Sequence, residues 1–189
     1  TTFVPSEGAR SGGGFRTPRL STYLDWNNDE NIITYFTPRF SGFQLGVSYA
    51  PVVSGSGDGA NFPVQADEDT EFNNGFSFGA NFVETVADID VAVSGGYRRA
   101  EAPDAFDLVD IEDLEQFSVG ANLGYAGFTV GGSYAKEDSS RATDGDSWDV
   151  GGSYSTGPWT VGVNYFTSEV DGQQIAGAGA PIQDGDDEV

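Results

Sequence analysis

Hydrophobic residues recur at every second position along seven segments of the chain. In the first of them, Phe43, Leu45 and Val47 alternate with Gln44 and Gly46. A period of two is typical of a β-strand whose two faces meet different surroundings. The seven segments are residues 43–49, 76–83, 89–97, 117–125, 128–134, 148–154 and 159–165, and an eighth, with less regular alternation, is residues 31–37. The pattern therefore predicts eight strands.

One uncharged stretch, residues 116–135, is long enough to be tested as a membrane-spanning helix. It contains five glycines and regularly spaced Ser, Asn and Thr, so its helix propensity is low. Its polar positions follow the strand period. Alternation by itself leaves two strand architectures open, a soluble antiparallel sandwich or barrel with an apolar core and a barrel with an apolar outer band.

The lengths of the joins between the expected strands separate these two architectures. Short and long joins alternate strictly, and in an up-and-down meander this places every long join at one end of the sheet. Outer-membrane barrels have this polarity, whereas soluble sandwiches do not need it. The short joins are residues 38–42, 84–88, 126–127 and 155–158, and the long ones are residues 50–75, 98–116, 135–147 and a tail from 166. We therefore predict an all-β, antiparallel, up-and-down transmembrane β-barrel with about eight strands present.

The face of these strands that carries small and polar residues indicates how wide the barrel is. Side chains must fill the interior of a closed eight-stranded barrel, and glycine, serine, threonine and asparagine are too small to do so. A barrel of roughly 16 strands encloses water instead, so we expect this chain to form part of such a wall. The residues expected to line the pore are Gln44, Ser48, Ser77, Asn81, Asp90, Ser94, Ser118, Asn122, Thr129, Ser133, Asp149, Ser153, Thr160 and Asn164.

The composition removes most enzymatic chemistry. The chain has no Cys and no His, which excludes thiolate and imidazole metal ligands and a Ser-His-Asp triad. With 30 acidic against 8 basic residues, the net charge of −22 argues against a nucleic-acid partner. We expect no catalytic activity, no cofactor and no bound metal. Residues 144–146 and 184–188 carry closely spaced carboxylates, but neither has the complete spacing of a calcium loop.

Most of the acidic residues fall in the long joins and the tail. In the predicted meander these segments share one rim, where they produce a negative field over one mouth of the barrel. Charge in or near a pore determines ion selectivity. We therefore expect the channel to prefer cations.

Two stretches carry a resemblance to a known family. Residues 33–49, ITYFTPRFSGFQLGVSY, resemble the strand–turn–strand that follows the constriction loop in general diffusion porins of Gram-negative bacteria, particularly the alphaproteobacterial type. Residues 157–163, GPWTVGV, resemble a later hairpin of that family. The resemblance spans about residues 31–168. It implies a 16-stranded barrel in outer-membrane lipid, usually a homotrimer, that passes small hydrophilic solutes and ions.

The resemblance also divides the chain. Residues 31–168 would supply middle strands with long acidic outer loops, residues 169–189 an acidic loop or tail, and the chain would be an internal fragment lacking the first and last strands. Residues 1–30 would take the place of the constriction loop, with partners from the wall. Its alternative is a truncated end outside the pore. The constriction candidates are Arg10, Arg16, Arg19, Asp25, Asp29, Glu30, Arg98 and Arg99.

A second function stays open at this point. The same strands could form a complete, small, eight-stranded outer-membrane barrel with a structural or adhesive role. That protein would have a plugged interior and no conductance.

Overall fold

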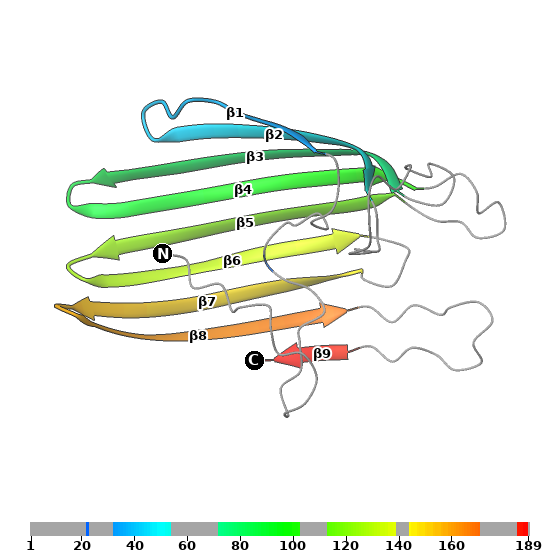
Figure 1. Ribbon diagram of the computed structural model, residues 1–189. Coiled ribbons are helices and arrows are strands. Elements are labelled where there is room, and N and C mark those ends of the chain that lie inside the picture. The colour runs from blue at the N-terminus through cyan, green and yellow to red at the C-terminus, as the bar shows by residue number, and fades with distance from the viewer. Residues whose placement is uncertain are drawn as a thin grey trace.

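The computed structural model describes residue 22 and residues 32–53, 72–102, 113–138, 144–170 and 185–188. These residues form one antiparallel sheet of nine strands, in which each strand pairs with its neighbour in chain order (Figure 1). The predicted all-β, up-and-down architecture is confirmed. The strands are β1 (Ile33–Phe36), β2 (Phe43–Val53), β3 (Phe72–Val86), β4 (Ile89–Glu101), β5 (Leu114–Tyr125), β6 (Phe128–Asp138), β7 (Gly145–Thr156), β8 (Trp159–Val170) and β9 (Gly185–Glu188). Within the described ranges, no helix has the length and apolar character needed to cross a membrane.

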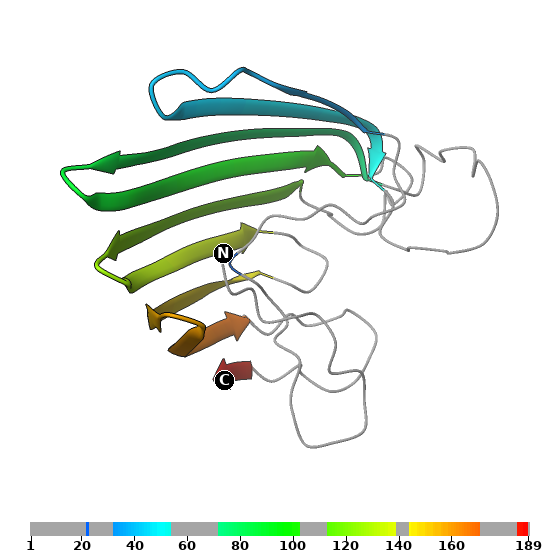
Figure 2. The ribbon, with the colours of Figure 1, turned by 60° about the vertical axis from the view of Figure 1, so that its left-hand side comes forward.

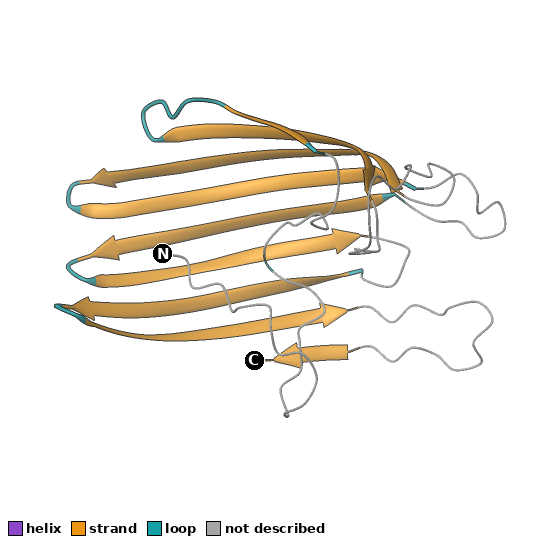
Figure 3. Cartoon of the chain, in the orientation of Figure 1, coloured by secondary structure: helices purple, strands orange, loops and turns teal. Residues whose placement is uncertain are grey.

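Tight turns join the strands at one end of the sheet, which we call the turn end (Figure 3). The β5–β6 turn, Ala126–Gly127, has positive φ at both residues, 49° and 86°. This conformation matches the twist of two-residue hairpins, and glycine adopts it without steric cost. The β7–β8 turn begins with Gly157, also at positive φ, and the β3–β4 turn is Ala87–Asp88. The opposite end is called the loop end.

The strands are longer at the loop end than the alternation predicts. The β3 strand begins at Phe72 rather than at residue 76, and β6 continues to Asp138. The predicted long joins are correspondingly too long. On β6 the last three residues are Lys136, Glu137 and Asp138, so apolar alternation stops while backbone pairing to β5 continues.

The stretch predicted as an acidic loop or tail, residues 169–189, includes a short strand that the alternation did not indicate. Residues Gly185–Glu188 form β9, which pairs with the end of β8 from Thr167 to Val170. A run of glycine and carboxylates has no hydrophobic period, so the pattern could not indicate it. The sheet is open, with β1 and β9 at opposite margins of the curved wall (Figure 2).

Strand register separates two faces with opposite chemistry. All fourteen residues expected to line a pore fall on one face, which we call the polar face; for example, Gln44 pairs with Asn81, and Asn81 pairs with Ser94. Most of the large hydrophobic side chains occupy the other face, the apolar face, where Val163 is 77% exposed. Exposed apolar side chains thus far outnumber buried ones in the described strands.

Aromatic pairs lie on the apolar face near both ends of the strands. The ring centroids of Phe128 and Tyr154 are 4.3 Å apart near the turn end. Those of Trp148 and Tyr165 are 5.3 Å apart nearer the loop end. Tyr154 and Trp148 are six residues apart on β7, which is ~20 Å along a strand. Two aromatic levels of this kind flank the apolar band of a membrane barrel.

The small hydrophobic core lies at the loop end. It consists of Ala50, Val53, Phe72 and Ala100, with Ala102 and Leu114 packed against it. The middle of the polar face contains no such cluster among the described residues.

Candidate functional site

The centre of the polar face is built from glycines covered by asparagine amides. The register places Asn122 of β5, Gly131 of β6, Gly151 of β7 and Asn164 of β8 in one row. A Cβ on Gly151 would lie 2.6 Å from Asn164 Oδ1, and a Cβ on Gly131 would overlap the Asn122 amide oxygen. The amides therefore extend sideways over the neighbouring backbone. This gives a low, polar surface.

Asp149 is the charged group in the middle of this surface. Its Oδ1 accepts hydrogen bonds from Ser133 Oγ on the adjacent strand and from Thr22 Oγ1, the latter at 3.1 Å. Thr22 belongs to residues 1–30, so one residue of this segment contacts the polar face at Asp149. Thr22 was not among the constriction candidates, and those of that segment, Arg10, Arg16, Arg19, Asp25, Asp29 and Glu30, lie outside the described residues.

A cluster of polar and charged side chains spans three neighbouring strands at the loop end of the polar face. Gln116 lies between Arg98 and Glu137 in the register. Its Nε2 donates to Glu137 Oε2 at 2.8 Å, and Arg98 Nη2 lies 3.8 Å from the same oxygen. Arg98 is only 8% exposed, and a buried guanidinium requires a partner of opposite charge. This contact fixes one positive and one negative charge on the polar face.

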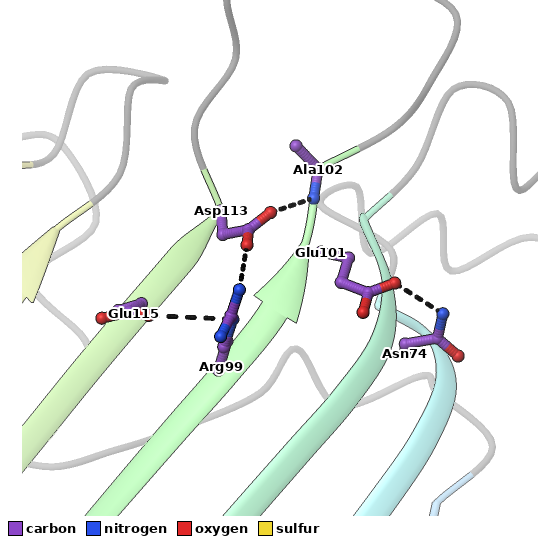
Figure 4. Close-up of polar contacts among 6 residues, drawn as sticks. All are labelled: Asn74, Arg99, Glu101, Ala102, Asp113 and Glu115. Carbon is purple, nitrogen blue, oxygen red and sulfur yellow. Dashed lines mark hydrogen bonds and ion pairs between the residues drawn. The ribbon is translucent and has the colours of Figure 1, made fainter.

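Arg99, the other wall candidate, belongs to a different cluster. Adjacent strand residues point to opposite faces, so Arg99 lies on the apolar side, at the loop-end rim (Figure 4). Its Nη2 is 2.5 Å from Asp113 Oδ2, and its Nε is 3.7 Å from Glu115 Oε1. Of the two arginines, only Arg98 lies on the polar face.

Two further contacts complete the rim. Asp113 Oδ1 accepts a hydrogen bond from the Ala102 N–H at 3.0 Å, and Asn74 Nδ2 donates to Glu101 Oε2 at 2.7 Å (Figure 4). The Ala102 hydrogen bond and the Arg99 guanidinium together lower the pKa of the Asp113 carboxyl below its ordinary value. Both favour the ionised form. The cluster ties β3, β4 and the start of β5 together at the edge of the apolar face.

The turn end carries a cation that the alternation did not identify. Arg39, in the join between β1 and β2, donates to Gly42 O at 2.6 Å, to Asn81 Oδ1 at 2.7 Å and to Gln44 Oε1 at 3.3 Å. Both side-chain acceptors belong to the polar face. Alternation assigns a face only to residues inside strands, so a turn residue that reaches back over the sheet gives no signal. Nearby on β4, Asp90 Oδ1 accepts from Thr85 Oγ1 at 2.7 Å.

The structure describes the first of the two stretches considered for calcium, residues 144–146, in full and the second, residues 184–188, in part. Asp144 and Asp146 are described, whereas Asp184 is not. Over the described ranges, no group of three or more His, Cys, Asp or Glu residues is placed to hold a metal ion.

Comparison with known protein families gives a match. The family model described as Gram-negative porin matches residues 3–188. Neither the curated proteins nor the solved structures contain a match.

Proposed function

The chain belongs to the Gram-negative porin family, and we propose that the polar face of its sheet lines a water-filled channel for passive diffusion of small hydrophilic solutes and ions. Membership of the family places the protein in the outer membrane. The apolar face then contacts lipid. This explains why its large side chains are exposed along the whole described sheet.

One observation supports the channel above all others: the fourteen expected pore residues share a face with rows of glycine. In a narrow barrel this face would enclose an unfilled interior, whereas in a wide barrel it meets water. Lipid does not tolerate unpaired strand edges, and β1 and β9 do not pair with each other. We therefore propose a closed wall of about 16 strands, in which further strands connect the edges formed by β1 and β9.

The assembly proposed for the complete barrel is the homotrimer that the resemblance implies. Chemical cross-linking of the protein in native membranes measures it. A ladder ending at three copies supports the trimer, and a species that never exceeds one copy contradicts it.

We also propose that residues 1–30 narrow the channel. The support is the hydrogen bond between Thr22 and Asp149, which puts one residue of the segment against the polar face. Because the chain has no cysteine, the pair Thr22→Cys with Asp149→Cys tests this proposal directly. Oxidation should cross-link the two thiols and reduce the freedom of the segment in the channel. A double variant that stays reduced contradicts the proposal.

Cation preference is the selectivity that the charge distribution supports. Carboxylates gather at the loop end, including Glu101, Asp113 and Glu115, and the chain carries a net charge of −22. Reversal potentials across a bilayer in a KCl gradient should have the sign of a cation-preferring pore. They should move toward zero as salt rises, because screening weakens the field. A reversal potential of the opposite sign contradicts the assignment.

The same recording tests the channel itself. A purified, folded protein that inserts into bilayers without any conductance contradicts the proposed function. It supports instead the small eight-stranded barrel with a structural or adhesive role.

A further inference from the structure

Arg39 stands apart from the other cations that the structure describes. It lies at the turn end, in the join between β1 and β2, and it is exposed. Three acceptors hold its guanidinium: the carbonyl of Gly42 and the side chains of Gln44 and Asn81. Gln44 and Asn81 face each other across β2 and β3 on the polar face. The positive charge is therefore held in place at the turn-end edge of the channel surface.

Among the residues that the structure describes, Arg39 forms no ion pair. All three acceptors are uncharged carbonyl or amide oxygens. Arg98 and Arg99, by contrast, form the described ion pairs with carboxylates. A guanidinium has five N–H groups, and these three hydrogen bonds leave two of them for a solute.

A described charge of opposite sign at the turn end of the polar face, Asp90, belongs to another hairpin. Asp90 begins β4 and is bonded to Thr85. Its side chain lies beside Gly124 of β5, where an added Cβ would be 3.2 Å from Asp90 Cβ. At the turn end, the positive group thus lies in the β1–β2 join and the negative group on β4.

We propose that Arg39 is a specificity-determining residue: a fixed contact for anionic groups at the turn-end mouth, which moderates the cation preference set at the loop end. The proposal rests on the proposed channel. Coulomb attraction raises the local concentration of an anion about fivefold at 4 Å from a solvated cation. Screening reduces the effect strongly near 1 M salt, where the Debye length is about 3 Å.

The test uses the full chain in planar bilayers under a KCl gradient at low salt, with chloride as the probe. The variant Arg39→Gln should raise the potassium-to-chloride permeability ratio by roughly two- to fivefold. Arg39→Lys keeps the charge and should restore most of the wild-type ratio. The comparison variant is Arg99→Gln, which removes the same charge from the loop-end rim on the opposite face and should shift the ratio less than Arg39→Gln does.

A fourth variant protects the test against a folding defect, because Arg39 also bridges the turn. Asn81→Asp is isosteric and places a carboxylate on the guanidinium, so it changes the charge of the mouth by the same unit as Arg39→Gln. Both variants should shift the ratio in the same direction. An unchanged ratio in Asn81→Asp, or a Lys variant that behaves like the Gln variant, overturns the proposal. A wild-type protein without conductance overturns the channel instead, so the two failures are distinguishable.

Discussion

The two faces of the sheet share the same strands and backbone hydrogen bonds but differ in almost every side chain. On β5, Val119 projects from the apolar face and is 51% exposed, while the preceding Ser118 lies on the polar face. Backbone pairing satisfies the polar groups of the main chain on both faces equally. The side chains alone therefore decide which face meets hydrocarbon and which meets water.

The contrast between the faces ends at the loop-end rim. There Arg99 and Asp113 form an ion pair on the side that is apolar elsewhere, and Arg98 is buried on the polar side. On β5 the rim follows directly after the aromatic pair of Phe117 and Tyr134. Charge on the apolar side thus begins where the hydrocarbon band is expected to end.

Placing a charge on the apolar face should produce the largest effect. Val119→Lys should lower the free energy of unfolding by about 2–4 kcal/mol, because the ammonium group would enter the hydrocarbon region. Denaturant titration of the protein in lipid vesicles measures this change.

The control for this variant is the adjacent residue. Ser118→Lys adds the same charge to the water-facing side and should change the unfolding free energy by no more than about 0.5 kcal/mol. Equal losses in the two variants would show that the faces do not meet different media.

The packing of glycines on the polar face predicts a smaller effect. Gly131→Ala should cost about 1–3 kcal/mol, because its Cβ would overlap the Asn122 amide and lie 2.8 Å from the Ala121 carbonyl oxygen. The same vesicle titration measures it.

Gly79→Ala is the matched control on the same face. Its Cβ would come no nearer than 3.9 Å to the Gly95 carbonyl oxygen, so its stability should be unchanged or slightly raised. Indistinguishable stabilities of the two variants would contradict the placement of the Asn122 amide over Gly131.

The smallest effect on stability is expected at the loop-end rim, and this effect should depend on pH. Asp113→Asn should cost about 1 kcal/mol or less, because the ion pair with Arg99 is partly exposed to solvent. The folded-state pKa of Asp113 is lowered from 3.8. Its contribution is therefore present above pH 3.8 and is lost as the pH falls through the lower folded-state value.

Unfolding curves of the wild type and Asp113→Asn from pH 7 to pH 2.5 measure this dependence. The difference between them should be constant at neutral pH and should shrink below pH 3.8. A difference that first appears or grows in acid would have the wrong sign for a carboxylate stabilised in its ionised form.

Local chemistry explains which parts of the fold the sequence could predict. Strand starts next to the turns, such as Phe43 and Phe128, were predicted correctly because large apolar residues there directly follow turn glycines. Toward the loop end, charged residues such as Lys136 and Glu137 occupy both faces, so the period of two fades while the hydrogen bonds continue. The β9 strand has no apolar residue at all.

The functional face could be predicted better than its contacts. Alternation assigned residues such as Asn122 and Asn164 to one face, and the register places them there. The cross-strand placement of an amide over a glycine depends on register, which one strand does not encode. Arg39 lies in a turn, and its side chain reaches back over the sheet to Asn81. Alternation within strands gives no information about such a contact.

Thiol labelling tests the central claim, that hydrocarbon covers the apolar face and water covers the polar face. The natural absence of cysteine allows single variants Val119→Cys and Ser118→Cys to be compared in the membrane. A charged, water-soluble thiol reagent should modify Ser118→Cys and leave Val119→Cys unmodified, although Val119 is exposed in the chain itself. Rapid modification of Val119→Cys from water, with Ser118→Cys protected, would contradict the account.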